Sequence, residues 1–253
     1  MASRPQPDRV AEPVVQRVRL RYAKRGPLRF TSHRDFQRAF ERAIRRAGVP
    51  IAFSAGFSPH PRISYANAAP TGVASEAEYL EIGLTRQVPP VQLRDALDAA
   101  LPIGMDVLEA VTAISADFAE RLEASVWLVE LFDVPLADLD RAIADLLRAP
   151  RAEVTRMTKA GMRTFDARHA LLGLERQSGE AGAPAARSSA EYAILRLVVR
   201  HTTPAVRPDD ILQALVSVGS LQTRTPARVT RQSQGPLTAD ARGVSDPFAA
   251  DRV

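Results

Sequence analysis

The sequence predicts an α+β protein made of two tandem ferredoxin-like domains, each an antiparallel sheet with the element order β-α-β-β-α-β. Segments with alternating apolar residues, typical of half-buried strands, are separated by segments with apolar residues at helical spacing. The order strand, helix, strand, strand, helix, strand occurs once in each half of the chain. With 253 residues, the chain is long enough for two small domains.

The first predicted strand spans residues 14–23 and has one apolar and one basic face. Its side chains alternate, with Val18, Leu20 and Tyr22 on one face and Arg17, Arg19 and Arg21 on the other. A capping-box pattern begins at Ser32 and predicts a helix that runs to Ala47 and is ended by Gly48. The predicted buried stripe of this helix is Phe36, Ala39, Phe40, Ala43, Ile44 and Ala47.

The rest of the first domain completes the predicted order. Residues 50–62 are rich in proline, glycine and aromatic residues, which predicts a loop. The remaining elements are strands at 63–68, 76–85 and 105–112 and a helix at 90–101. Because the helices of such a domain cover one face of the sheet, we expect the opposite face to stay open to partners.

The second half of the chain repeats this order. Strands are predicted at 124–134, 152–158, 191–200 and 227–231, with helices that begin at Pro135 and Pro208. Residues 161–174 are predicted to be irregular or a short extra strand. The predicted domains are 14–115 and 122–232, the second with a flexible insert at 178–189, between disordered tails at 1–13 and 233–253.

Composition limits the possible functions. The chain contains no cysteine, which excludes disulfides, thiolate metal sites and cysteine-held iron–sulfur clusters. No apolar run approaches the roughly 20 residues needed to span a bilayer, and the first ten residues lack the apolar core of a secretory signal. We therefore expect a cytoplasmic protein with no membrane contact and no cofactor of its own.

Positive charge is concentrated near the amino end. Residues 17–46 contain eleven arginines and lysines against two acidic residues, a local net charge of +9, whereas the whole chain carries +5. This imbalance predicts an anion-binding surface, most simply for nucleic acid, with a solvated charged face as the alternative. Only Lys24 and Lys159 among the 34 basic residues are lysines, which indicates that these positions need a compact ammonium group.

Two segments, 30–35 and 56–62, combine basic and aromatic residues. The first places a helix amino terminus, which attracts anions, beside His33 and Arg34. Arginines add bidentate phosphate contacts and aromatic rings stack on bases, a mixture that suits single-stranded or looped RNA. The residues predicted to bind RNA or another anion are Arg17, Arg19, Arg21, Lys24, Arg29, Arg34, Arg38, Arg42, Phe57, His60, Arg62, Lys159 and Arg163.

Other interpretations of these segments stay open. The prolines flanking His60 are also consistent with a rigid structural loop. His33 and His60 are candidates for general acid–base catalysis, as in a metal-independent ribonuclease. No fixed ligand spacing supports a metal site made of His33, Asp35 and His60, so no metal is predicted. The second basic segment, 159–169, is equally consistent with an ordinary turn between strands.

A resemblance to a known family lies in three stretches, at residues 28–50 (LRFTSHRDFQRAFERAIRRAGVP), 53–81 (FSAGFSPHPRISYANAAPTGVASEAEYLE) and 156–174 (RMTKAGMRTFDARHALLGL). They are similar to the radical-SAM-linked protein family, and the resemblance covers residues 15–232. Members of this family are small bacterial proteins of unknown function, encoded beside or fused to a cobalamin-binding radical SAM protein. The resemblance therefore implies such a protein as a partner and implies no catalytic residue.

The leading hypothesis is an accessory protein that binds a structured RNA, such as tRNA or rRNA, for a radical SAM enzyme. A metal-independent RNA-processing enzyme that acts through His33 and His60 is the first alternative. A purely structural subunit of a radical SAM complex is the second. Whether the chain is catalytic stays open, and a non-catalytic partner is the favoured interpretation.

Overall fold

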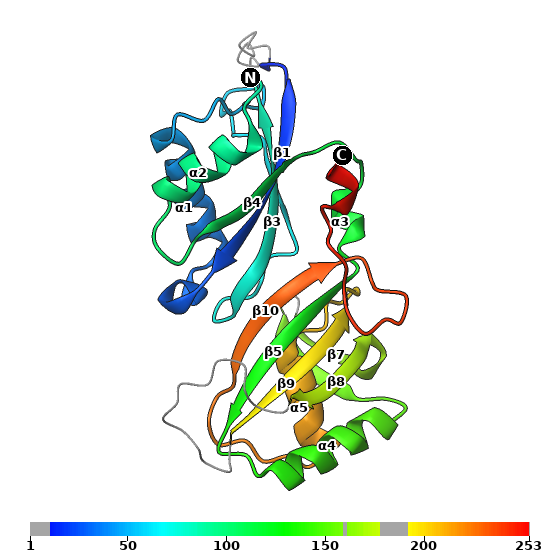
Figure 1. Cartoon of the computed structure of the whole chain (residues 1–253). Coiled ribbons are helices and arrows are strands. Elements are labelled where there is room, and N and C mark those ends of the chain that lie inside the picture. The colour runs from blue at the N-terminus through cyan, green and yellow to red at the C-terminus, as the bar shows by residue number, and fades with distance from the viewer. Residues whose placement is uncertain (1–10, 159–160, 178–191, 253) are drawn as a thin grey trace, which may run out of the picture. The chain divides into compact units, whose positions relative to one another are not determined.

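The computed structural model describes residues 11–158, 161–177 and 192–252 (Figure 1). The chain divides into two compact units, Met1–Ala119 with Phe248–Val253 and Glu120–Pro247. Both units combine helices with antiparallel strands, which confirms the α+β class. Within the described ranges, no helix is both long and apolar enough to cross a membrane.

Unit 1 has its strands and helices in the predicted order. They are β1 (Gln16–Lys24), α1 (His33–Arg46), β2 (Ile63–Ala66), β3 (Ala74–Leu84), α2 (Pro90–Ala100) and β4 (Val107–Thr112). A 3-10 helix, η1 (Gly26–Phe30), connects β1 to α1. The strands lie in the order β4-β1-β3-β2, and each neighbouring pair is antiparallel.

The core of unit 1 lies between the two helices and one face of this sheet (Figure 1). The alternation along β1 buries Val18, Leu20 and Tyr22, because successive residues of a strand point to opposite faces. Tyr22 stacks on Phe36 of α1 with ring centroids 4.3 Å apart. The predicted stripe of α1 is the buried one, with Phe36 and Phe40 at its centre.

Both ends of α1 follow the predicted caps. Ser32 Oγ accepts a hydrogen bond from the Asp35 backbone N–H at 3.2 Å and donates one to the Asp35 carboxylate at 2.7 Å. Gly48 follows the last turn with a φ of +63°, in the left-handed region that glycine adopts without steric cost. The sequence therefore determines the position of this helix through local chemistry.

The carboxyl-terminal segment packs on the sheet face opposite the helices. Tyr79 of β3 contacts Phe118 and Phe248, with ring centroids 5.5 and 5.2 Å away. Phe248 is fully buried and precedes a 3-10 helix, η3 (Ala249–Asp251). The prediction of a disordered tail at 233–253 is therefore wrong, because residues 233–235 belong to a paired strand and the side chains of Phe248 and Asp251 are buried.

Unit 2 likewise combines antiparallel strands with two helices. Its elements are β5 (Ala124–Phe132), α4 (Leu136–Arg148), β6 (Glu153–Thr158), β7 (Gly161–Asp166), η2 (Arg168–Ala170), β8 (Leu171–Gln177), β9 (Tyr192–Arg200), α5 (Pro208–Ser217) and β10 (Arg228–Gly235). The sheet order is β10-β5-β9-β8. The end of α5 packs closely on α4, since a Cβ added to Gly219 would come within 2.6 Å of Ala142.

One element assignment in unit 2 differs from the prediction. Residues 152–158 were expected to be the second strand of the sheet, but β6 pairs with β7 in a separate two-stranded hairpin. β8, which lies in and beyond the segment expected to be irregular or a short extra strand, takes the sheet position beside β9. The insert predicted at 178–189 and most of the tail predicted at 1–13 lie outside the described residues.

Candidate anion-binding site

The arginines of β1 do not form the open cationic face that the sequence predicts. Arg17 and Arg19 each contact the Glu81 carboxylate at 3.0 Å, and Arg21 lies 3.6 Å from Glu109. Neighbouring strands supply these carboxylates, because Glu81 is the register partner of Arg19 on β3 and Glu109 that of Arg21 on β4. Most of the positive charge of β1 is therefore neutralised within the sheet.

Arg19 is also inaccessible, with only 3% of its surface exposed. Its guanidinium contacts the carboxylate of Asp251 and donates to the hydroxyl and carbonyl oxygens of Ser115. Asp251 in turn accepts hydrogen bonds from the backbone N–H groups of Ile114 and Ser115 at 3.0 and 2.9 Å. The expectation that Arg19 belongs to an RNA-binding surface is wrong, because its guanidinium N–H groups already donate to groups of its own unit.

Lys24 is buried as well, which corrects its predicted role in anion binding. Its Nζ donates to the carbonyl oxygens of Ala69 and Pro70 at 3.5 and 3.2 Å. The neighbouring Arg25 is bound by the carboxylates of Glu76 and Asp106. The hydrogen bond that Arg25 donates to Glu76 is the main reason that the pKa of Arg25 is raised above its ordinary value. The two cationic side chains of the turn after β1 are thus already bonded within the unit.

Cations without a carboxylate partner lie on the outward side of α1. Arg34, Arg42 and Arg45 are exposed and form no ion pair within the described parts of the chain. Arg38 lies 3.8 Å from Asp35, but both side chains are about 60% exposed and such a pair stabilises little. Arg29 stacks over the exposed ring of Phe30 at 4.6 Å. This surface retains its charge for a ligand.

The start of α1 packs against β2. His33 contacts the ring of Tyr65 edge-on at 4.9 Å and lies 3.1 Å from the Gln37 amide. Burial, followed by the charge of Glu41, raises the pKa of Tyr65 above its ordinary value. The Ser32 and Asp35 cap already occupies the helix amino terminus, which argues against an anion site there.

The two ends of the loop before β2 pair with each other, and we call the paired residues, 53–54 and 60–61, the neck of the loop. An isolated bridge pairs Phe53 with Pro61, and the Ser54 N–H donates to the His60 carbonyl at 2.9 Å. The His60 N–H donates back to Ser54 Oγ at 3.0 Å. These bonds hold the neck, while Phe57 at the far end is 63% exposed. The loop therefore leaves Phe57, His60 and Arg62 exposed next to these bonds.

A pocket of about 260 Å³ opens between this neck and the sheet. The charged and polar groups that line it are Arg17, Ser54, His60, Arg62, Ser64 and Glu81, together with Pro61 and Ile63. Arg62 forms no ion pair within the described residues, so it adds a charge that Glu81 does not cancel. We call this cavity the β2 pocket.

The β2 pocket brings together three predicted residues and adds three that the sequence did not indicate. Arg17, His60 and Arg62 line it, whereas His33 does not. Ser54, Ser64 and Glu81 were missed because their roles depend on the neck and on strand pairing. Only Ser64 carried a local signal, since it alternates with Arg62 and therefore points to the same face of the sheet.

The remaining predicted cations lie on unit 2. Arg163 is exposed on β7 opposite Arg156 of β6, and Lys159 lies outside the described residues. Arg156 is not available to a ligand, because it contacts the buried carboxylate of Asp210 and the carbonyl of Ala205. No group of three or more His, Asp or Glu in the described ranges could hold a metal ion.

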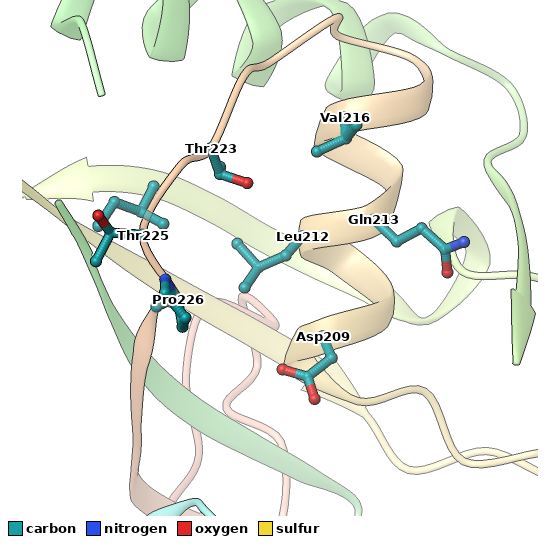
Figure 2. Close-up of a pocket in the computed structure, with 9 residues that line it drawn as sticks. Asp209, Leu212, Gln213, Val216, Thr223, Thr225 and Pro226 are labelled. Atoms are coloured by element: carbon teal, nitrogen blue, oxygen red, sulfur yellow. The ribbon is translucent and has the colours of Figure 1, made fainter. Parts of the chain in front are cut away.

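Unit 2 also has a pocket of about 390 Å³ beside α5 (Figure 2). Leu212, Val216 and Pro226 give it apolar walls, and Asp209 is the one charged residue that lines it. In Figure 2, Asp209 and Gln213 lie on the helix and Thr223 and Thr225 on the segment that follows it. This pocket lacks the cationic groups that an anion needs.

Fold and site together define a two-unit α+β protein with a small polar pocket and an unneutralised arginine surface on its first unit. Residues 17–208 match the model of a family described as an uncharacterized protein conserved in bacteria, DUF2344. Since this match covers most of the chain, the protein belongs to the DUF2344 family. A comparison with curated proteins gives no match.

Proposed function

We propose that this protein is a non-catalytic accessory that binds structured RNA, such as tRNA or rRNA, for a cobalamin-binding radical SAM enzyme in the cytoplasm. The observation that carries the RNA-binding part is the surplus of unpaired arginines on α1, together with the exposed ring of Phe30 in the preceding η1. Unpaired guanidinium groups attract phosphates, and exposed rings offer stacking surfaces. The radical SAM partner is supported by the resemblance of the three sequence stretches alone.

We also infer that both units have ferredoxin-like topology. In unit 1 the sheet order β4-β1-β3-β2 follows a β-α-β-β-α-β chain order. Unit 2 has the equivalent order β10-β5-β9-β8 once the β6–β7 hairpin is set aside as an insertion. The antiparallel pairing in each sheet supports this inference.

The proposed RNA surface differs from the one expected at the sequence level. It consists of Arg34, Arg38, Arg42 and Arg45 of α1, with Arg29 and the exposed ring of Phe30 in the preceding η1. Arg19 and Lys24 are omitted because they are buried, and Arg21 because Glu109 pairs with it. This revised set commits the proposal to one outward surface of unit 1.

The catalytic alternative receives no specific support from the geometry. His60 lines the β2 pocket, whereas His33 packs against Tyr65 and Gln37. A general acid and a general base must both reach the same reacting groups. Because the two histidines lie in separate surroundings, binding is favoured over cleavage.

RNA affinity measured against salt concentration tests the proposal. A protein that neutralises phosphates loses affinity as salt rises, with a slope of about 0.7 per contact for single strands. Changing both Arg34 and Arg42 to Ala should lower this slope by about 1.4. The matched control changes Arg141 and Arg148 of α4, which are equally exposed but paired with Asp138 and Asp145.

Two outcomes would contradict this function. Absence of RNA affinity at low salt would remove the RNA-binding part outright. An equal loss in the α1 and α4 variants would reduce the effect to net charge. A stable complex with a radical SAM enzyme that contains no nucleic acid, and that survives the Arg34 and Arg42 changes, would support the structural-subunit alternative instead.

A further inference from the structure

We propose that the β2 pocket is a binding site for a phosphate monoester, and that the RNA ligand therefore presents a terminal phosphate to it. This inference rests on the proposed function only for the identity of the ligand as RNA. The pocket itself is defined by the loop neck, β2 and the adjoining face of β1 and β3. The argument uses its charge, its hydrogen-bond donors and its size.

The charge of the pocket favours an anion. Glu81 is the one carboxylate that lines it and is held at 3.0 Å by both Arg17 and Arg19. Arg62 stands outside this network, and His60 also lines the pocket. With Arg17 balanced by Glu81, Arg62 leaves a net positive charge in a partly enclosed space.

The donors in the pocket suit phosphate oxygens. A guanidinium group presents a planar fork that matches two oxygens of a phosphate. Ser54 Oγ accepts a hydrogen bond from the His60 N–H, so its own hydroxyl hydrogen can be donated to a ligand. Ser64 lies opposite Glu81 in the strand register and lines the same cavity with a second hydroxyl.

The size of the pocket suits a compact ligand, and its charge favours a monoester over a diester. Its volume of about 260 Å³ is below the range of about 300–1,000 Å³ typical of sites for drug-sized ligands. A phosphate with part of its sugar is a compact ligand of this kind. A terminal monoester carries nearly two negative charges at neutral pH, whereas an internal diester carries one. The monoester thus gains more from Arg62.

Titrations with small ligands test the pocket without RNA. Uridine 5′-monophosphate and inorganic phosphate should bind, with shifts of the His60 ring signals in NMR spectra, whereas uridine should not. Arg62→Ala should weaken binding of the monophosphate about tenfold, the effect of losing one charge-assisted hydrogen bond. Arg86→Ala is the control, since Arg86 is an exposed arginine of unit 1 that does not line the pocket.

Binding of RNA with and without a 5′-phosphate separates this inference from the proposed function. A short single strand with the phosphate should bind about tenfold more tightly than its 5′-hydroxyl counterpart, and Arg62→Ala should remove the difference. Equal affinity for both strands would overturn the inference and leave the RNA-binding function standing. If no RNA binds, the proposed function fails, while uridine monophosphate binding lost in Arg62→Ala would still support the pocket. Equal binding of uridine and its monophosphate would overturn it.

Discussion

Asp251 takes the place of water around the buried guanidinium of Arg19. Its carboxylate accepts hydrogen bonds from Arg19, from the Ser115 hydroxyl and N–H, and from the Ile114 N–H. Burial alone would raise the pKa of this carboxyl, but the bonds from Ser115 and Arg19 outweigh burial and lower it well below its ordinary value of 3.8. The charged form is therefore the one that the fold stabilises.

The pH dependence of stability should report this lowered pKa. A carboxyl with a lowered pKa in the folded state contributes stability above its unfolded pKa, and this contribution is lost as pH falls toward the folded value. Asp251→Asn should therefore destabilise unit 1 by about 3 kcal/mol at pH 7, because Arg19 loses its buried counter-charge. The difference from the unaltered protein should shrink as pH falls below 3.8.

Chemical unfolding of both proteins at pH 7 and pH 3 provides the measurement. Asp95→Asn serves as the control, since Asp95 of α2 in unit 1 is exposed and its pair with Arg94 is exposed as well. A pH-independent difference between Asp251→Asn and the unaltered protein would mean that the charge of Asp251 is irrelevant to its contribution.

Residue-level prediction succeeded where the determinant was local and failed where it was not. The Ser32 cap and the Gly48 terminator were predictable because their chemistry acts within a few residues. The burial of Arg19 was not predictable, because its partner Asp251 is 232 positions away in the chain. The ammonium group of Lys24 donates to two backbone carbonyls. The scarcity of lysine in the chain drew attention to this residue but did not reveal that it is buried.

At the scale of elements, an arginine of β6 links the β6–β7 hairpin to α5 and to the segment before it. Arg156 contacts Asp210, donates to the Ala205 carbonyl and lies 5.0 Å from the ring of Phe165. Burial raises the pKa of Asp210, and the Arg207 N–H and Arg156 act against that effect. Removing Arg156 would leave a buried carboxylate without its main counter-charge.

Arg156→Ala should loosen the hairpin and destabilise unit 2 by about 3 kcal/mol. Hydrogen exchange is the measurement, and the amides of 153–158 and 161–166 should lose protection before those of β5 and β9. Arg163→Ala is the matched control, because Arg163 is the register partner of Arg156 and is exposed. We expect this change to stay within about 0.5 kcal/mol. Similar effects of both variants would contradict the anchoring role.

The same hairpin explains why one element of unit 2 was placed incorrectly. Its alternating pattern is that of a strand, and periodicity correctly predicts a strand at 152–158. Periodicity cannot say which strand is the neighbour, because register partners are set by tertiary packing. Leu171–Gln177 contains Gly173 and three polar residues, which weakens its strand signal although it forms a sheet edge.

At the scale of the whole molecule, the two ends of the described chain belong to the same unit. Residues from β1 onward and the segment from Phe248 both contribute to unit 1, while the intervening residues from Glu120 form unit 2. Composition alone indicated disorder for residues 233–253, since the part before Phe248, SQGPLTADARGVSDP, is rich in polar and turn-forming residues. Phe248 and Asp251, which anchor the end of the chain in unit 1, act through distant contacts and leave no local pattern.

Deleting residues 248–253 should therefore destabilise unit 1 and spare unit 2. The loss of the fully buried Phe248 ring should by itself cost about 3 kcal/mol or more, and Arg19 would lose Asp251 at the same time. Hydrogen exchange resolved by segment distinguishes the units, which a single melting temperature of a two-unit chain cannot do. Protection should fall in β1 and β3 and stay unchanged in β5 and β9.

Arg252→Ala is the control, because the contact of Arg252 with Glu109 is exposed and should contribute less than about 1 kcal/mol. If β5 and β9 lose as much protection as β1 and β3, the segment supports more than the unit with which it packs.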